Sequence, residues 1–188
     1  MNPFPAALAA ACLFALPAVA GTPVSVGHFD SVSLKGGGHV VVRHGERQSV
    51  TLIKGSTQYT TFRLRRENQL EIRACEGDCP RHYELEIEIV TPDLDAAAIE
   101  GGGHIVAENG FPGRREISAA VEGGGDLDLS ALKAEKVSAA VSGGGHIAVT
   151  ALHDLSAAVE GGGSIVYHGN PQVSSAIDGG GSVSKASR

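Results

Sequence analysis

Histidine and aspartate side chains follow glycine triplets in this chain, at positions where their types and spacing could support ligand binding. A GGG triplet occurs six times, and the residues directly after the triplets are His39, His104, Asp126, His146, Ser164 and Ser182. Imidazole and carboxylate groups bind divalent transition metals and hydrogen-bond polar ligands. If the triplets repeat in space, His104, Asp126 and His146 form a column that is a candidate metal site. The alternative interpretation is a solvated column, because the last two copies carry only serine.

A pair of cysteines is the second candidate for chemistry. Cys75 and Cys79 lie in the segment ACEGDCPRH, and such a pair in an oxidising compartment is most simply a disulfide. Closing so short a loop would restrict the unfolded chain by roughly 2 kcal/mol. The alternative is a metal site that also recruits His82, but no fourth ligand is evident and C-x-x-x-C is an unusual zinc spacing. We therefore predict a Cys75–Cys79 disulfide.

Carboxylates are the third candidate, because pairs of them catalyse glycoside hydrolysis. Asp126 and Asp128 share one face of a strand-like segment, and glutamates stand directly before three triplets, at Glu100, Glu122 and Glu160. Glycosidases place two carboxylates about 5–9.5 Å apart around the scissile bond. The longest connection between repeats, ENGFPGRRE, is too short to build the cleft that such an enzyme needs. We expect no catalytic residues, no cofactor and no enzyme activity, with a carbohydrate-active enzyme as the weaker alternative.

Charged residues also alternate along strand-like segments in the N-terminal half. TFRLRRENQLEIRA is typical of a β-hairpin turning at Glu67 and Asn68, and YELEIEIVTP directs alternate residues to opposite faces. The charged set on these strands comprises Arg63, Arg65, Glu71, Arg73, Glu84, Glu86 and Glu88. We expect a solvated outer face with weak cross-strand charge pairs, in which nothing shifts a pKa.

The candidate residues are positioned by an internal repeat. Its five copies read AAAIEGGGHIVA, SAAVEGGGDLDL, SAAVSGGGHIAV, SAAVEGGGSIVY and SSAIDGGGSVSK, and the spacing of successive triplets falls from 22 to 18 residues. A repeat of roughly 20 residues with constant internal phase is typical of a solenoid. A phosphate-binding loop is excluded because a β-type segment, and no helix, follows each triplet.

Each copy fits one coil of a parallel β-helix. Stacked coils lie about 4.8 Å apart, so equivalent inward positions form continuous ladders that hold the fold together. The predicted ladders are Ala97, Ala119, Ala139, Ala157 and Ser175; Ile99, Val121, Val141, Val159 and Ile177; and Ile105, Leu127, Ile147, Ile165 and Val183. The glycines turn the corners and let adjacent backbones approach closely, while variable loops close the coils.

The fold class is therefore all-β, with the repeats at about 94–188 preceded by an N-terminal β-hairpin region that caps one end. Residues 29–91 alternate with period two, which is typical of half-buried strands. Aromatic residues make up 4% of the chain and tryptophan is absent, which suits a thin core of small side chains. We expect residues 21–188 to form one domain.

The first twenty residues are typical of a secretory signal peptide. They carry no charge, run apolar over residues 6–16 and end in Ala18-Val19-Ala20, which predicts cleavage between Ala20 and Gly21. A membrane anchor is less favoured because the apolar run is short and Pro17 interrupts it. A lipoprotein at Cys12 is disfavoured, since Ala9 occupies the position where a lipobox has leucine. No second apolar segment approaches spanning length, so no transmembrane segment is expected after cleavage.

The repeat phrases also resemble a known bacterial envelope family, the auto-transporter adhesin head GIN domain. The resemblance spans the opening FDSVSLKGGGHVVVRHGERQSVTLIKG, the central IEIVTPDLDAAAIEGGG and the closing GGGSIVYHGNPQVSSAIDGGGSV. The closing phrase, with Tyr167, Gly169 and Pro171, is the most specific part. The resemblance implies a right-handed parallel β-helix exported to the periplasm or cell surface of a bacterium, and it implies no catalytic residues.

These features favour a non-enzymatic, adhesin-like envelope protein. The net charge of −6 disfavours a nucleic-acid partner. Candidate partners are a surface polysaccharide, another envelope protein or a second copy of the chain, because a solenoid has open ends that must be capped or paired. The alternative is a periplasmic metal or ligand binder that uses the column of His104, Asp126 and His146.

Overall fold

The computed structural model describes residues 21–187 of the chain. Within this range the secondary structure is almost entirely β, interrupted by one 3-10 turn, η1 (Arg66–Asn68). The predicted signal peptide, including Ala20 of the expected cleavage site, lies outside the described residues. The all-β fold class predicted from the sequence is confirmed.

In the part of the chain that the structure describes, fifteen strands form one continuous hydrogen-bonded system. Those of the N-terminal half are β1 (Thr22–Val24), β2 (Ser31–Gly36), β3 (His39–His44), β4 (Ser49–Lys54), β5 (Thr61–Leu64), β6 (Gln69–Arg73) and β7 (Glu86–Thr91). Those of the repeats are β8 (Ala96–Gly101), β9 (His104–Ala107), β10 (Arg114–Gly123), β11 (Asp126–Gly143), β12 (His146–Gly161), β13 (Ser164–Gly169), β14 (Gln172–Asp178) and β15 (Ser182–Lys185).

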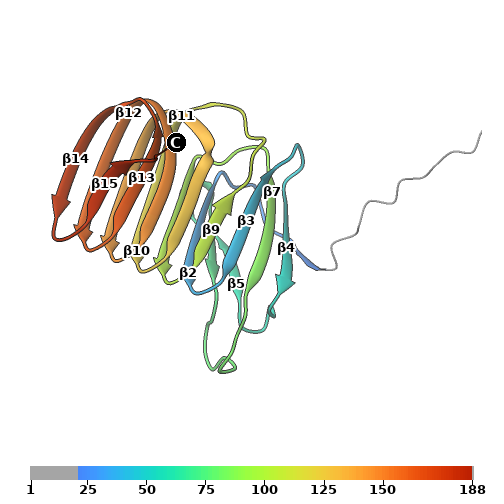
Figure 1. The fold of residues 1–188 in the computed structure, drawn as a ribbon. Helices are drawn as coiled ribbons and strands as arrows, with labels where there is room; N and C mark the ends of the chain where they lie inside the picture. The colour runs from blue at the N-terminus through green and yellow to red at the C-terminus, as the bar shows by residue number, and fades with distance from the viewer. Residues whose placement is uncertain (1–20, 188) are drawn as a thin grey trace, which may run out of the picture.

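The repeats stack as the coils of a parallel β-helix (Figure 1). On one side β8, β10, β11, β12 and β14 pair in parallel. The first glycines of four successive triplets lie beside one another in this register, in the order Gly101, Gly123, Gly143 and Gly161. On the other side β9, β11, β12, β13 and β15 pair in parallel. Around the corners the coils therefore stack in constant register, as the constant phase of the repeat predicts, whereas the β11–β12 pairing has register shifts between Leu129 and Lys136.

The first glycine triplet belongs to the same stack. β2 pairs in parallel with β8, placing Gly36 beside Gly101, and β3 pairs in parallel with β9, placing His39 beside His104. Residues 31–44 thus form a further coil of the stack. This coil precedes the five repeats that are recognisable from their spacing in the sequence. Residues 45–95 are inserted after this coil, which breaks the regular period in the sequence.

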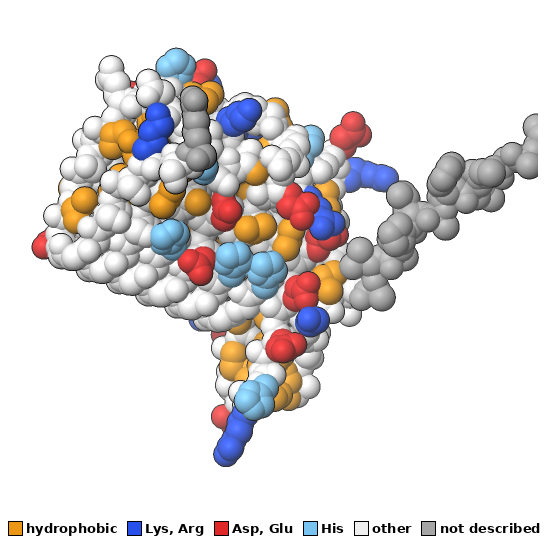
Figure 2. All heavy atoms as spheres, in the orientation of Figure 1, with side chains coloured by type: hydrophobic (Ala, Val, Ile, Leu, Met, Phe, Trp, Pro, Cys, Tyr) orange, Lys and Arg blue, Asp and Glu red, His pale blue; other side chains and the backbone are white. Residues whose placement is uncertain are grey.

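The inserted residues build the predicted hairpin region. β5 and β6 pair antiparallel, and the turn between them places Glu67 and Asn68 at positive φ, as the hairpin prediction requires. β4 pairs antiparallel with both β1 and β7, and these strands cover the N-terminal end of the stack (Figure 1). On the face shown in Figure 2, charged side chains are more frequent over this end than over the coils.

The expectation that loops close every coil is wrong for the central coils. β11 and β12 continue through these segments as single strands of 18 and 16 residues. Leu132 and Ala134 point into the core, and Ala134 pairs with Arg114 on one side and Ala151 on the other. The segments extend because neighbouring coils supply hydrogen-bonding partners on both edges, which a polar composition such as SALKAEK does not reveal.

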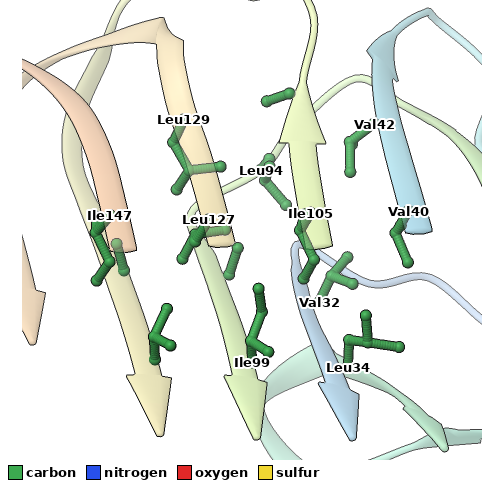
Figure 3. Close-up of a cluster of buried hydrophobic side chains, with 14 of the residues drawn as sticks. Val32, Leu34, Val40, Val42, Leu94, Ile99, Ile105, Leu127, Leu129 and Ile147 are labelled. Carbon is green, nitrogen blue, oxygen red and sulfur yellow. The ribbon is translucent and has the colours of Figure 1, made fainter. Parts of the chain in front are cut away.

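The core consists of the predicted aliphatic ladders (Figure 3). Ile99, Val121 and Val141 stack on the inner side of the face that contains β8 and β10. Ile105 and Leu127 stack on the inner side of the face that contains β9. All five are at most 2% exposed. These ladders lie between the two faces of the solenoid. They continue into the N-terminal half through Val32 and Leu34 of β2 and Val40 and Val42 of β3. Burial is therefore continuous along the axis of the solenoid.

A buried carboxylate corrects the prediction of a fully solvated charged face. Glu71 on β6 is only 5% exposed, and its carboxylate accepts hydrogen bonds from Arg65 at 2.7 Å and Arg73 at 2.9 Å. Lys35 Nζ lies 3.5 Å from the same group. The hydrogen bond from Arg65, opposed by burial and reinforced by Arg73, lowers the pKa of Glu71 from 4.5 to about 2. The long side chains around it exclude water, which alternation along one strand does not predict.

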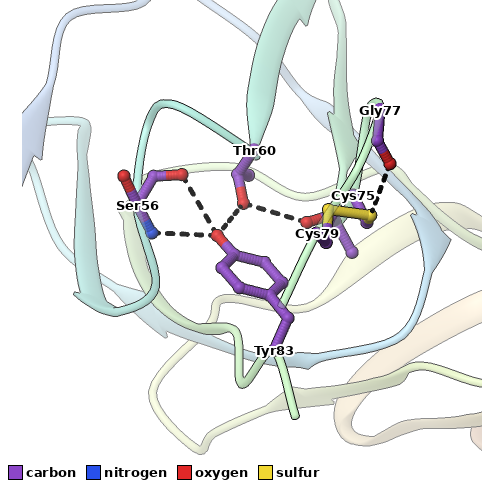
Figure 4. Close-up of a disulfide and its surroundings, with 7 residues drawn as sticks. Ser56, Thr60, Cys75, Gly77, Cys79 and Tyr83 are labelled. Carbon is purple, nitrogen blue, oxygen red and sulfur yellow. Dashed lines mark hydrogen bonds between the residues drawn. A yellow bond between two sulfur atoms is a disulfide. The ribbon is translucent and has the colours of Figure 1, made fainter. Parts of the chain in front are cut away.

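The predicted disulfide between Cys75 and Cys79 is confirmed, with 6.1 Å between the two Cα atoms (Figure 4). The sulfurs are bonded to each other, so the alternative of a metal site with His82 is wrong. Below the disulfide, the Tyr83 hydroxyl lies 2.6 Å from Thr60 Oγ1 and accepts a hydrogen bond from the Ser56 N–H. These contacts hold separate segments of the inserted region against one another.

Candidate functional site

The residues that follow the glycine triplets form one continuous ladder across the molecule. Strand register places His39 beside His104, Asp126 between His104 and His146, and Ser164 beside His146. The three residues predicted as a column are therefore adjacent. We call the full set the polar ladder, and in spatial order it consists of Glu86, His39, His104, Asp126, His146, Ser164 and Ser182.

Glu86 is a member that the sequence reasoning missed. It pairs with His39 on β3 and with Lys54 on β4, whose Nζ lies 3.2 Å from its carboxylate. No glycine triplet precedes Glu86, so the repeat does not mark it. Its only signal was its place in the alternating segment YELEIEIV, which fixes the face but not the neighbouring strand.

Main-chain geometry positions the polar ladder. The backbone N–H groups of His104, Asp126 and His146 donate hydrogen bonds to carbonyl groups of the adjacent coil. The acceptors are Gly38, Gly103 and Gly125, each the last glycine of the triplet one coil earlier. The ladder side chains point outward because successive side chains alternate across a strand, and the residue that follows each ladder position is buried in every coil but the last, where Val183 is partly buried. The glycine corner thus determines where each ladder residue lies relative to the adjacent coil and in which direction its side chain points.

The side chains of the ladder contact one another in pairs. The rings of His39 and His104 stack with centroids 4.9 Å apart and an interplanar angle of 9°. His104 Nδ1 lies 4.0 Å from Asp126 Oδ2. His146 Nδ1 instead hydrogen-bonds Ser164 Oγ, on the side away from Asp126. Figure 2 shows the histidines and the carboxylate between them as a row across the exposed face.

A shallow hollow lies along the centre of the polar ladder. It has a volume of about 170 Å³ and is lined by His104, Asp126, Leu127, Asp128, His146 and Ala148. The Asp126 side chain is 63% exposed, while Asp128 Oδ1 accepts a hydrogen bond from the Ser130 N–H. The hollow can bind hydroxyl or cationic groups through its carboxylates and imidazoles. It does not exclude water from Asp126.

The column is not preassembled as a metal centre. Within residues 21–187 no group of three or more His, Cys, Asp and Glu side chains is arranged to hold a metal ion. His104 and Asp126 approach each other, but His146 is directed to Ser164. A metal ion would therefore have to reorient His146 to gain it as a third ligand.

The glutamates before the triplets form a separate row. Glu100, Glu122 and Glu160 lie on β8, β10 and β12, before the corner, whereas the polar ladder follows the corner. Lys35 Nζ lies 2.7 Å from Glu100 at the N-terminal end of this row. The two sets of carboxylates therefore lie on opposite sides of the glycine corner, and none of the three glutamates lines the hollow at the polar ladder.

The fold and its surface define the class of protein, a parallel β-helix whose most distinctive exposed feature is a polar ladder. Residues 113–171 match the family described as "Putative auto-transporter adhesin, head GIN domain". This match confirms the resemblance predicted from the repeat phrases. No curated protein is significantly similar to the chain.

Several solved structures are similar to the chain. A putative adhesin from Bacteroides fragilis is 17% identical, with 87% of this chain and 95% of that chain covered and a TM-score of 0.49. A putative adhesin from Parabacteroides merdae is 14% identical, with coverages of 89% and 96% and a TM-score of 0.42. A putative lipid binding protein from Parabacteroides distasonis is 16% identical, with coverages of 89% and 98% and a TM-score of 0.38. Within the described residues of our chain, no helix has the length and apolar character needed to cross a membrane.

Proposed function

We propose that this protein is an exported, non-enzymatic binding module of the bacterial envelope, adhesin-like, and that its polar ladder binds an extended polyhydroxylated polymer such as a surface polysaccharide. In this proposal residues 1–20 are a signal peptide and residues 21–188 are one domain, located in the periplasm or on the cell surface. The observation that carries the proposal is the ladder itself, in which imidazoles and a carboxylate stand on consecutive strands in one register.

The chemistry of the ladder suits such a polymer. The Asp126 carboxylate accepts hydrogen bonds from hydroxyls, and the imidazoles of His104 and His146 donate or accept them. All three groups are solvated before binding, so each contact with the polymer contributes only modestly to the free energy of binding. A polymer that repeats along the ladder engages several contacts at once, and the resulting effective concentration raises the overall affinity.

A non-enzymatic role is supported by the placement of the carboxylates. The large exposure of Asp126 leaves it hydrated, whereas catalytic carboxylates are tuned by burial or by close charged neighbours. The glutamates of the other row lie before the glycine corner, and none of them lines the hollow beside Asp126. Binding without cleavage is the expected outcome for any polysaccharide that the ladder retains.

The proposal predicts that H104A/H146A binds bacterial envelope polysaccharides at least ~10-fold more weakly than the native protein, since two imidazoles that each contribute about 1 kcal/mol are lost. Immobilised polysaccharide fractions and surface plasmon resonance provide the measurement. The matched control is H28A/H153A, which removes two exposed histidines outside the ladder. Native protein that retains no fraction, or equal binding by native protein and H104A/H146A, would contradict the proposal.

A second candidate function is binding of a divalent transition metal, favoured by the 4.0 Å approach of His104 Nδ1 to Asp126 Oδ2. Titration calorimetry with zinc or copper tests it. We expect binding at pH 7.5 that weakens at pH 5.5, because metal competes with protons for imidazole, and that disappears in H104A/H146A. If H104A/H146A and native protein bind the metal alike, this candidate fails.

A further inference from the structure

The last coil of the solenoid has a free edge. In the described part of the chain β14 pairs only with β12, and β15 pairs only with β13. Both strands lie at the outer end of the stack, where none of the other described strands covers them (Figure 1). The outer edge of β14 therefore presents main-chain donors and acceptors without a protein partner, which is a template for another strand.

Apolar side chains are exposed at the same edge. Val173 and Ile177 on β14 are 41% and 47% exposed, whereas their neighbours one coil earlier, Leu155 and Val159, are each 1% exposed. The aliphatic ladders thus reach the surface at β14, which is the last strand of this side of the stack within residues 21–187. Water at this end contacts side chains that are core residues in every preceding coil.

The edge strands at the N-terminal end are protected, in contrast. β1 has three residues and contains Pro23, and β5 carries Arg63 with Arg65 directly after it. Short length, proline and positive charge are the usual means by which proteins block pairing at a sheet edge. β14 has seven residues, QVSSAID, with no proline, lysine or arginine. Of these edge strands, all within residues 21–187, β14 is therefore the one suited to strand pairing.

We propose that β14 pairs antiparallel with β14 of a second copy of the chain, with Ser175 opposite its counterpart at the two-fold axis. This register places Val173 opposite the partner's Ile177 and Ser174 opposite the partner's Ala176. Opposed residues in an antiparallel pair point to the same face of the sheet, so the apolar ladders continue directly into the second copy. The proposal is independent of the polymer-binding function.

Charge is compatible with this register. Asp178 lies opposite the partner's Gln172, so the two Asp178 carboxylates lie at opposite ends of the β14–β14 interface and do not face each other. The pairing is self-complementary, as a two-fold dimer interface requires. It also closes the free edge, so it stops at two copies and forms no filament.

The first experiment is sedimentation velocity over a concentration series, with Ile177→Lys and Leu152→Lys as matched variants. Leu152 is 45% exposed, close to the exposure of Ile177, and it lies on β12 outside the segment Asp154–Glu160 that pairs with β14. We expect the native protein and L152K to dimerise and I177K to be monomeric. Circular dichroism confirms that both variants keep the β-fold. A native protein that stays monomeric at the highest concentration, or a dimeric I177K, overturns the proposal.

The second experiment tests the register through two double variants on the outward face of β14. In the proposed register residue 174 faces residue 176 of the partner, and the two-fold axis generates this pair twice. S174K/A176K therefore creates two lysine–lysine pairs, whereas S174K/A176E creates two lysine–glutamate pairs. We expect the dissociation constant of the dimer to be at least ~10-fold higher for S174K/A176K than for S174K/A176E in low salt, and the difference to shrink in high salt. Equal dissociation constants for the two variants overturn the proposed register.

Discussion

Gly143→Ala is expected to destabilise the protein by about 3 kcal/mol, while Gly144→Ala at the next position changes stability by less than about 0.5 kcal/mol. Gly143 has φ of +118°, and a Cβ there would lie 2.5 Å from the carbonyl oxygen of Gly123 in the adjacent coil. Backbone strain of this kind costs about 1–3 kcal/mol, and the overlap with a fixed backbone adds roughly 1–3 kcal/mol. Gly144 has open space within 4 Å of its Cβ position and no positive φ.

Urea or thermal unfolding of the two variants measures the difference. A loss of about 3 kcal/mol in a domain of this size corresponds to a decrease in Tm of about 6–12 °C. Gly145→Ala extends the test, because its Cβ would overlap Val121 Cγ1 and should also destabilise the fold. Equal effects at all three positions would show that neither the positive φ nor the close approach of adjacent backbones makes glycine necessary at the corner.

Glu71→Gln is expected to destabilise the protein by about 2 kcal/mol at pH 7. Removing one partner of a buried ion pair costs about 3–5 kcal/mol, and the effect is smaller in this protein because Arg65 and Arg73 are 44% and 34% exposed and stay hydrated. Glu116→Gln, which removes an exposed glutamate on β10, is the matched control and should change stability little.

The same carboxylate predicts a specific loss of stability in acid. The pKa of Glu71 is lowered from 4.5 to about 2 in the folded protein, so the unfolded chain takes up this proton first as the pH falls. Its contribution is fully present above about pH 5 and is lost between about pH 4.5 and pH 2. Unfolding free energies measured from pH 7 to pH 2 should converge for native protein and E71Q. Parallel curves across this range would contradict the assignment.

The repeat made most of the fold predictable. Identical positions such as Val121 and Val141 recur with constant phase, and only stacking of the copies buries them all. The same phase predicted that Asp126 would lie beside His104 and His146. A disulfide between Cys75 and Cys79 followed from their proximity in the chain. These predictions succeeded because each depends on local spacing or on strict repetition.

The amino-acid pattern was sufficient to predict the solenoid, its inward ladders and the central residues of the polar ladder, since a repeated pattern has one way to stack in register. The pairing of distant strands was needed to establish which residues of the insertion join that stack. Glu86 lies beside His39, and Glu71 lies close to Lys35, because strands distant in sequence pair there. Alternation along one strand determines which face a side chain occupies. It does not determine the neighbouring strand, and the neighbour determines burial, charge partner and pKa.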